Sequence, residues 1–466
     1  MLADIGETNS SFLAAGGAVN RWPVISKGYA VAAVSQDILE RFRTQYGKDI
    51  DLTLRPAYRD LLAAMGNPQD KIPPVFHVAG TNGKGSTCAF LRAILEAAGY
   101  RVHVYTSPHL VRFHERIRVA GALIEESELA AILAQCEAVA APGKVSYFEA
   151  ATAAAFVAFA RHPADFTILE TGLGGRLDAT NIVEKPLATI ITRLSYDHRD
   201  YLGDSIAQIA REKAGIMRAG VPCFTAPQPE VEALATLRAA AAEKGAALHV
   251  GGGDWRVEET ADGFTFADAA RRYDLPKPGL VGRHQVWNAG LAIAALAALP
   301  RPLPADAVAQ GVRRVEWPAR MQRLTAGFLP ALLPPGAELW LDGGHNDSAG
   351  EVVAAQIAQW RREDGDAPRP LYIVTGMLTT KRPAEFIGPF AHAVTRARTV
   401  VIEDEPLSFG ADALAGEMRA LGIDDVAAAA GIADAVQDLA GATTTPAPRL
   451  LICGSLYLAG RVLAIG

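Results

Sequence analysis

The segment Gly80–Thr87, which reads GTNGKGST, is the feature that most constrains this chain. It lies between the apolar stretch Val75–Val78, which predicts a strand, and Ser86–Ala98, which predicts a helix. Glycines let successive backbone N–H groups face one anion, and a helix N-terminus adds the positive end of its dipole. The segment departs from the usual phosphate-loop pattern because Gly85 separates the lysine from the serine. A turn without a ligand is the alternative, but the flanking strand and helix favour phosphate binding.

Side chains suited to phosphate and metal chemistry lie in and near this segment. Lys84 would neutralise the β- and γ-phosphates of a nucleotide, and the Ser86 hydroxyl would bind Mg²⁺. Glu170 ends the apolar stretch Phe166–Glu170, at the point where open α/β sheets place ligand groups. Its carboxylate would complete the shell of a Mg²⁺ ion or, alternatively, cap a neighbouring helix.

Strand-like and helix-like segments alternate along most of the chain, which predicts an α/β architecture with mainly parallel sheets. In the first part we predict a third strand over Ala188–Thr192, a helix over Ser205–Met217 and short antiparallel strands within Leu248–Leu275. The strands predicted for the second part are Glu338–Leu341, Leu371–Thr375, Thr399–Ile402 and Leu450–Cys453. A boundary near Trp317–Arg320 divides the chain into an N-terminal extension (1–35), a larger domain (36–315) and a smaller domain (316–466).

Composition excludes several other classes of protein. The net charge is -6, so there is no basic footprint for a nucleic acid. The four cysteines are widely spaced, which favours buried thiols in a reducing cytoplasm over a zinc site or a disulfide framework. No apolar run approaches the roughly 18 residues of a membrane span. The start of the chain does not have the pattern of a signal peptide.

Other candidates are ambiguous when considered singly. His198 follows the third predicted strand, and Lys213 lies beside Glu212 on a predicted helix, where a solvated charge pair is the usual interpretation. Asp342 and His345 follow a predicted strand and would suit a ribose or a neighbouring ligand. The loop from Gly172 to Asp178 resembles a dinucleotide fingerprint only superficially, because a leucine replaces the third glycine.

Taken in order, the motifs resemble the folylpolyglutamate synthase/dihydrofolate synthase family of the Mur ligase superfamily. The resemblance covers the chain from about Asp51 to its end. The motifs that carry it are GTNGKGS (Gly80–Ser86), TSPHL (Thr106–Leu110), FE..T..AF (Phe148–Phe156), E.GLGGRLDATN (Glu170–Asn181), DH...LG.SI..IA.EKAGI (Asp197–Ile216), HQ..NA (His284–Ala289), LDGGHN (Leu341–Asn346) and CGSLYLAG (Cys453–Gly460). In this family the phosphate loop contains the additional glycine. Its fold would be a phosphate-loop domain with a mainly parallel sheet, followed by a smaller Rossmann-like α/β domain.

The resemblance implies roles for these residues, with Lys84, His198 and Lys213 as the catalytic ones. The ATP-binding residues that it implies are Thr81, Asn82, Gly83, Lys84, Gly85, Ser86, Thr87, Asn288, Arg320, Asp342 and His345. Ser86 and Glu170 would hold one Mg²⁺ ion, and His198 and Lys213 a second. Lys213 corresponds to the family's carbamylated lysine, which reverses its interpretation as a solvated charge. The residues implied for the pterin side are Ser107, Pro108, His109, Phe148, Arg176 and Asp178.

The implied reaction is ligation of L-glutamate to dihydropteroate or to a reduced folate, in a cytoplasmic monomer. The γ-phosphate of ATP first activates the carboxylate as an acyl phosphate, which the amine of glutamate then attacks, and closure of the second domain keeps water out. Two departures from the family pattern are WPAR for WPGR and LDGGHN for LDGAHN. The segment Asp49–Leu52, ahead of Met65–Pro68, resembles bifunctional enzymes and favours both activities.

Several alternatives remain open at this point. A synthase that only extends the glutamate tail, and a Mur-type ligase for a peptidoglycan precursor, would share the ATP and metal apparatus. TSPHL, GLGGRLDATN and CGSLYLAG favour the folate branch over the peptidoglycan one. A nucleotide-dependent switch would need no second metal ligand, and an adenylating ligase would release AMP and pyrophosphate in place of ADP and phosphate.

Overall fold

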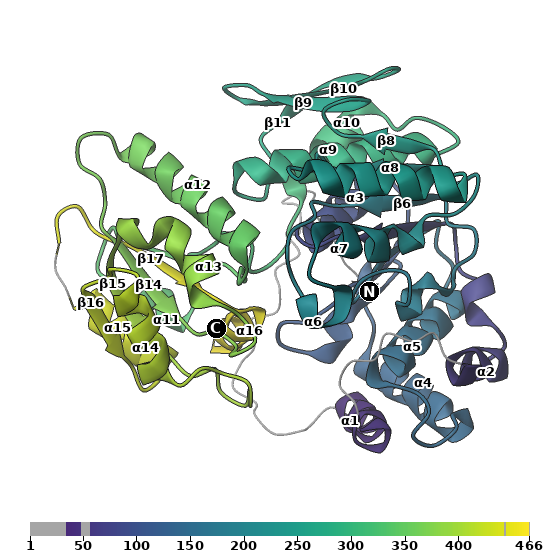
Figure 1. The fold of residues 1–466 in the computed structure, drawn as a ribbon, viewed down its shortest axis with the longest axis horizontal. Coiled ribbons are helices and arrows are strands. Elements are labelled where there is room, and N and C mark those ends of the chain that lie inside the picture. Colours follow the sequence, from purple (N-terminus) through teal and green to yellow (C-terminus); the bar gives the residue numbers. More distant parts are fainter. Residues whose placement is uncertain (1–33, 48–55, 442–443, 466) are drawn as a thin grey trace, which may run out of the picture.

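The computed structural model describes residues 34–47, 56–441 and 444–465, which form two bodies side by side (Figure 1). Most of the predicted N-terminal extension, and the segment Asp49–Leu52, lie outside these residues. We keep the proposed division and refer to residues 36–315 as the central domain and to 316–466 as the C-terminal domain. None of the helices in the described ranges combines the length and the apolar sequence of a membrane span.

The central domain is built on one large sheet. Its strand order is β4-β3-β2-β5-β1-β6-β7-β8, and all neighbours are parallel except the pairs β2–β3 and β3–β4. The strands are β1 (Val75–Ala79), β2 (Val102–Tyr105), β3 (Ile117–Val119), β4 (Ala122–Leu123), β5 (Phe166–Glu170), β6 (Ala188–Ile191), β7 (Cys223–Thr225) and β8 (Leu248–Val250). The central strands are buried on both faces, as their continuous apolar sequences predict.

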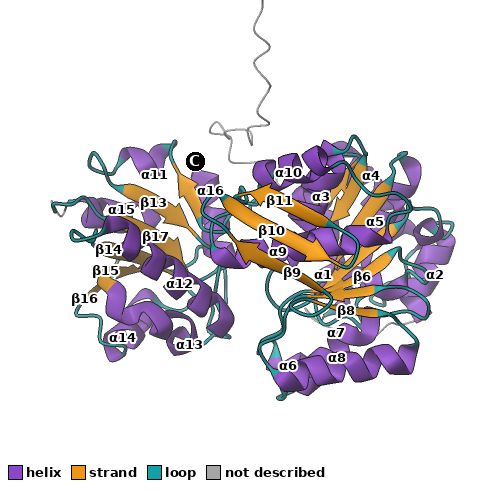
Figure 2. Cartoon of the chain, turned by 90° about the horizontal axis from the view of Figure 1, so that it is seen from above, coloured by secondary structure: helices purple, strands orange, loops and turns teal. Residues whose placement is uncertain are grey.

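Helices cover both faces of this sheet (Figure 2). They are α1 (Val34–Tyr46), α2 (Pro56–Ala64), α3 (Lys84–Ala97), α4 (Glu126–Val139), α5 (Tyr147–Arg161), α6 (Arg199–Leu202), α7 (Ile206–Lys213), α8 (Val231–Lys244), α9 (Arg283–Ala295) and α10 (Ala305–Arg314). Apolar side chains of α3, α9 and α10 pack on one face of the sheet, while those of α1, α2, α4 and α5 pack on the other. All four cysteines are buried free thiols, as predicted.

A small antiparallel sheet lies over α9, at the top of the larger body in Figure 1. It has the order β11-β10-β9, with β9 (Trp255–Glu259), β10 (Gly263–Asp268) and β11 (Arg272–Pro276). The prediction of short antiparallel strands is correct for these three. It is wrong for the start of the predicted segment, because β8 adds in parallel to β7 at the edge of the large sheet.

The C-terminal domain has its own sheet, in the order β12-β13-β17-β14-β15-β16. Only β12 runs antiparallel to its neighbour. The strands are β12 (Gln322–Leu324), β13 (Glu338–Leu341), β14 (Leu371–Thr375), β15 (Val394–Thr399), β16 (Asp425–Ala428) and β17 (Arg449–Cys453). The helices are α11 (Phe328–Ala331), α12 (Asp347–Asp364), α13 (Pro383–Ile387), α14 (Ala411–Ala420), α15 (Ile432–Ala440) and α16 (Leu456–Ile465). The mixed α/β class with mainly parallel sheets is confirmed.

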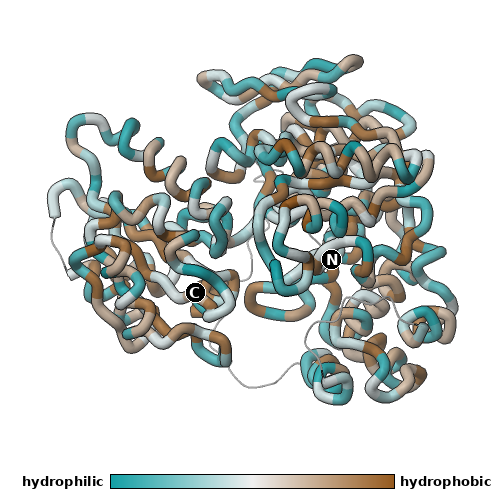
Figure 3. Tube along the Cα trace, viewed as in Figure 1, coloured by the Kyte–Doolittle hydropathy of each residue, from teal (hydrophilic) through white to brown (hydrophobic). Residues whose placement is uncertain are grey.

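One strand of this sheet was predicted in the wrong place. The prediction put it over Thr399–Ile402, whereas β15 ends at Thr399. The earlier residues of β15 include Arg396 and Arg398, and these charged residues interrupt the apolar pattern by which a buried strand is predicted. In Figure 3, apolar segments, drawn in brown, run through the interior of both bodies.

Candidate active site

A cavity of about 250 Å³ is lined by residues of both domains. The carboxyl ends of the neighbouring strands β5, β1 and β6 meet here, the position at which open α/β sheets bind ligands. Its lining includes Thr81, Asn82, Gly83, Lys84, Gly85, Ser86, Ser107, Pro108, His109, Glu170, His198, Asn288, Arg320, Asp342 and His345. The fold therefore brings together most of the residues selected from the sequence.

The phosphate loop connects β1 to the first turn of α3. The ammonium of Lys84 donates to the carbonyl oxygens of Gly80 at 3.1 Å and Thr81 at 3.2 Å. Gly85, the residue that interrupts the usual pattern, lies against the indole of Trp317. A Cβ atom at Gly85 would lie 2.7 Å from Nε1 of that ring, so only glycine fits there. The additional glycine thus allows the linker between the domains to pack on the loop.

Ser86 is connected to Asn288 through a residue that the sequence analysis did not select. Nε2 of Gln285 donates to the Ser86 hydroxyl at 3.3 Å, and Nδ2 of Asn288 donates to Oε1 of Gln285 at 3.0 Å. Gln285 is fully buried. Because Gln285 and Asn288 are three positions apart, they share one face of α9, and this spacing within HQ..NA was the available signal.

Glu170 is a buried carboxyl group surrounded by cations. Burial raises its pKa to about 7, although Lys84, the Ser107 amide and Arg320 act in the opposite direction. The Ser107 N–H donates to Oε2 at 3.3 Å. Within the described ranges, no three His, Cys, Asp or Glu side chains form a cluster that could hold a metal. A Mg²⁺ ion at Ser86 and Glu170 would therefore use phosphate and water oxygens as well, which is the usual arrangement for this ion. The two side chains fit such an ion.

Lys213 is buried, which contradicts its interpretation as a solvated charge. Its ammonium donates to the Gly80 carbonyl at 2.9 Å, the same oxygen that accepts from Lys84. Burial, together with the charge of Lys84, lowers the pKa of Lys213 to about 7. Its neighbour Glu212 instead pairs with Arg176 at 2.8 Å. The adjacent residues point in different directions because they are separated by about 100° around the helix.

His198 lies in the loop after β6, with a left-handed backbone φ of 51°. Its N–H donates to Oδ1 of Asp197 at 2.9 Å. Burial is the main cause that lowers the pKa of His198 to about 4, so the imidazole is neutral near pH 7 and can bind a metal. Asp197 behaves in the opposite way. Although burial acts to raise its pKa, His345, His198 and Lys381 hold it well below its usual range.

Comparisons with known proteins agree with this geometry. The Mur ligase middle domain family matches residues 78–296. The dihydrofolate synthase/folylpolyglutamate synthase of Bacillus subtilis is 40% identical over 318 residues, which cover 65% of this chain and 71% of that protein. The solved structure of E. coli FolC in complex with DHPP and ADP superposes with a TM-score of 0.81 at 33% identity, covering 93% of this chain and 98% of the other.

The chain belongs to the dihydrofolate synthase/folylpolyglutamate synthase family. It is accordingly an ATP-dependent ligase of the Mur superfamily. The Yersinia pestis enzyme of this family, solved with AMPPNP and a Mn ion, superposes with a TM-score of 0.79 at 31% identity and covers 94% of this chain and 99% of the other. A nucleotide and a divalent metal thus bind to a close structural neighbour.

The C-terminal domain of this family member closes the cavity with loops. Asp342 accepts from the Met321 amide at 2.9 Å and from the Gly344 amide at 2.7 Å, so both oxygens order their own loop. Burial raises its pKa. Nδ1 of His345 lies 3.1 Å from the Gly343 carbonyl. Asn346, which was not selected from the sequence, bonds to Asn82 of the phosphate loop.

The structure also locates the two departures from the family pattern. Ala319 has φ 55°, a left-handed conformation in which glycine is unstrained, so the alanine of WPAR tolerates some strain. Gly344 stands where the family has alanine, and a Cβ atom there would lie 2.7 Å from Oδ1 of Asp342. Both exchanges thus affect the loops that carry Arg320 and His345, while the residues that face the cavity are retained.

The residues predicted for the pterin side divide into two groups. Ser107, Pro108 and His109 line the cavity, and Phe148 packs directly behind Gly172. Asp178 instead accepts from the amides of Gly172, Leu173 and Thr180 and so orders its own loop. Arg176 is half-exposed and paired with Glu212. The fold does not place Asp178 or Arg176 in the cavity wall.

Proposed function

We propose that this ligase joins L-glutamate to dihydropteroate and also to reduced folates, and so carries both activities of its family. The observation that carries the proposal is a single cavity in which the phosphate loop, Glu170 and His109 of the central domain face Arg320 and Asp342 of the C-terminal domain. Support comes from the near-complete coverage of the FolC structure that contains DHPP and ADP. The alternative of tail extension alone would use the same cavity.

The reaction follows from the groups that line this cavity. A carboxylate is a poor electrophile, so transfer of the γ-phosphate to it must come before attack by the amine. Lys84 and Arg320 supply positive charge for the phosphoryl group as it moves. The α-amine of glutamate then attacks the acyl phosphate, and phosphate leaves. The products are an amide, ADP and phosphate, which distinguishes this reaction from adenylation.

Metal binding is proposed at two sites. Ser86 and Glu170 would hold one Mg²⁺ together with nucleotide oxygens, and His198 and a modified Lys213 a second. Mg²⁺ bound there would neutralise charge on the phosphoryl oxygens and orient them for in-line transfer. Burial raises the pKa of the Glu170 carboxyl group to about 7. A raised pKa of this kind is expected for a carboxyl group in a cation-binding site before the cation binds.

A carbamate on Lys213 would resolve an electrostatic conflict in this site. Two lysines, Lys84 and Lys213, donate to the one carbonyl oxygen of Gly80. Burial lowers the pKa of Lys213 to about 7, so much of its amine is neutral and able to react with CO₂. The resulting anion would attract the second Mg²⁺, which an ammonium would repel.

The cellular setting is proposed on the same basis. The substrates are ATP, L-glutamate and small pterin carboxylates, and the buried free thiols suit a reducing cytoplasm. Since both walls of the cavity come from one chain, we propose that a monomer is sufficient.

The test measures ADP release with Mg-ATP and L-glutamate in the presence of 7,8-dihydropteroate, a reduced folate, or no acceptor. Release with both acceptors, together with a mass gain of one glutamyl unit, is expected. Release with the reduced folate alone would restrict the protein to tail extension. If neither acceptor stimulates release, the folate assignment fails, and a peptidoglycan precursor is the next acceptor to try.

A further inference from the structure

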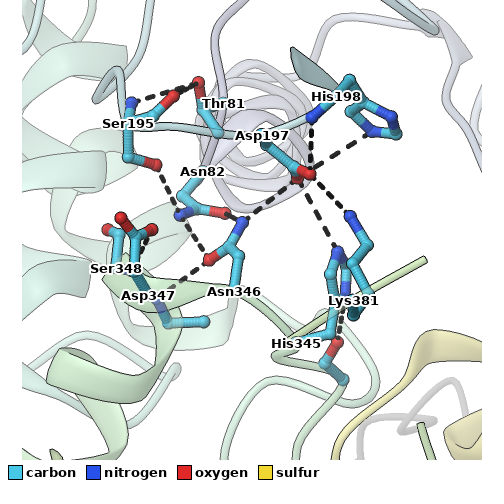
Figure 4. A network of polar contacts seen from close by, with 12 residues as sticks. Thr81, Asn82, Ser195, Asp197, His198, His345, Asn346, Asp347, Ser348 and Lys381 are labelled. Carbon is cyan, nitrogen blue, oxygen red and sulfur yellow. Dashed lines mark hydrogen bonds and ion pairs between the residues drawn. The ribbon is translucent and has the colours of Figure 1, made fainter. Parts of the chain in front are cut away.

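One carboxylate, that of Asp197, connects the two domains (Figure 4). Asp197 follows β6 in the central domain, and Lys381 lies in the loop after β14 in the C-terminal domain. Their Oδ1 and Nζ atoms are 2.6 Å apart, and the side chains are only 12% and 14% exposed. This ion pair is well shielded from solvent although it joins separate domains.

Further groups of the C-terminal domain converge on the same carboxylate. Nδ2 of Asn346 donates to Oδ2 of Asp197 at 3.2 Å, and Nε2 of His345 lies 3.9 Å from that oxygen. Asn346 and Asn82 also exchange amide hydrogen bonds at 3.1 and 3.2 Å. Asn346 caps α12 through the Ala349 amide, so the helix itself is fixed against the phosphate loop.

On the central-domain side, Asp197 also bonds to the backbone of His198. The bond from the His198 N–H to Oδ1 of Asp197 stabilises a turn in which His198 has φ 51°. Lys381 donates to that same oxygen. The Asp197 carboxylate therefore both stabilises the turn at His198 and accepts the hydrogen bond from Lys381 of the C-terminal domain.

The energetics favour a positioning role for this pair. When the domains separate, both charges regain water, so the pair adds little net stability to the closed state. Its directional contacts nevertheless favour one arrangement of the domains over others. An ion pair that adds little net stability but forms only in one geometry is suited to selecting a single arrangement of the closed domains.

We propose that Lys381 is a positioning residue whose ion pair with Asp197 couples closure of the C-terminal domain to the orientation of His198 and of the phosphate loop. The proposal rests on the proposed function for the reaction that closure protects. An acyl phosphate in an incompletely closed site is attacked by water, which returns the carboxylate and phosphate with no amide formed. The pair thus keeps ATP consumption coupled to ligation.

The first test replaces Lys381 with Met in the full chain. We expect kcat to fall about 10- to 100-fold, as for a displaced catalytic group. The ratio of ADP to glutamylated product should rise above that of the wild type, and Lys381→Arg should restore most of the coupling. An unchanged ratio and kcat would overturn the proposal. So would an effect confined to the KM for L-glutamate, which would make Lys381 a substrate ligand.

The chain provides a matched control. Arg193 and Glu351 form another ion pair between the domains, at 2.8 Å, but their side chains are 38% and 61% exposed. Glu351→Gln should leave kcat and the coupling ratio within about twofold, because exposed pairs contribute little. A loss equal to that of Lys381→Met would show that any contact between the domains has this effect, and would overturn a specific role.

A second readout does not depend on the acceptor. The native cysteines are all buried, so a pair of labels at new cysteines in place of the exposed Val231 and Glu417 reports the distance between the domains. With Mg-AMPPNP bound, we expect one narrow distance distribution in the wild type and broader ones in Lys381→Met and Asp197→Asn. Identical distributions would overturn the proposal. If no folate acceptor is glutamylated, the proposed function fails while this measurement still tests the ion pair.

Discussion

The two walls of the cavity are held in different ways. Lys84, Ser86 and Glu170 stand at the ends of buried strands or on the first turn of α3, and nearly all their contacts lie within the central domain. The groups on the opposite wall stand on loops, and polar bonds such as those of Asn346 connect them to the central domain. We therefore expect the phosphate-binding wall to be preorganised, and the second wall to enclose the nucleotide and the proposed acyl phosphate when it docks.

The comparison predicts the largest loss from the preorganised wall. Lys84→Met removes the charge that faces the transferred phosphoryl group, and we expect kcat to fall about 10³-fold. The fold should persist, because the bonds of the Lys84 side chain within the described residues are to loop carbonyls. Steady-state ADP release and circular dichroism measure the two effects, with Lys277→Met, at an exposed position, as the control. A loss of less than tenfold would contradict the role given to Lys84.

Lys213→Ala tests the same wall at a buried residue that lies behind the phosphate loop and donates to its Gly80 carbonyl. If a carbamate holds the second metal, kcat should fall about 100-fold, as for the loss of a group that orders a metal site. Short-chain carboxylic acids should then restore part of the activity, since they can occupy the place of the carbamate. Lys244→Met is the control, because Lys244 also donates to backbone carbonyls, but to those of Gly215 and Met217 and not to the phosphate-loop carbonyl that accepts from Lys213. Full activity of Lys213→Ala would exclude the carbamate.

The sequence predicted the preorganised wall well because that wall consists of local signals. The strand Phe166–Glu170, which ends at Glu170, has the predicted bounds, since a strand buried on both faces is continuously apolar. The phosphate loop is contiguous in the chain. The position of Lys213 required the family resemblance, because its neighbour Glu212 offered a plausible local partner that the fold assigns to Arg176.

Contacts between residues that are distant in the sequence, including those that join the two walls, could not be predicted in the same way. Asp197 and Lys381 lie 184 positions apart, and no periodicity relates them. Strand β15 was misplaced because Arg398 lies within it, and the charge of Arg398 is balanced by Asp425 and Asp438, which are distant in the sequence. Contacts of this kind are properties of the tertiary structure.

A smaller effect is expected where the two walls touch without polar contacts. Gly460 of α16 packs against the Leu110 backbone, and a Cβ atom there would lie 2.0 Å from the Leu110 oxygen. Gly460→Ala should hold the domains apart and lower kcat about tenfold, because the overpacking must be relieved by a shift of the helix. Gly416→Ala, in a helix of the same domain with open space around it, is the matched control. Equal activities of the two variants would show that closure does not depend on this contact.

The smallest effect concerns the pH dependence of stability, in which the two domains should differ. His77 is buried in β1, its Nε2 lies 2.8 Å from Oγ1 of Thr180, and burial lowers its pKa from 6.5 to about 3. The unfolded chain takes up a proton below pH 6.5 whereas the folded chain does not. The neutral histidine therefore gives its full stability above that pH, and this contribution is lost as the pH falls from about 6.5 towards 3.

At about pH 5.5, one pH unit below the pKa in the unfolded chain, His77 should lower the free energy of unfolding by about 1.4 kcal/mol. His77→Gln keeps a side chain able to bond to Thr180 but does not titrate, so it should lose that much less stability than the wild type between neutral pH and about pH 5.5. Hydrogen exchange in β1 and in β14 separates the domains, and the difference should appear in β1 alone. Because the pKa values of His109 and His284 in the central domain are also lowered, to about 3 and about 4, the variant should still lose some stability in β1. An equal loss in both proteins would mean that His77 does not control the acid sensitivity of the preorganised wall.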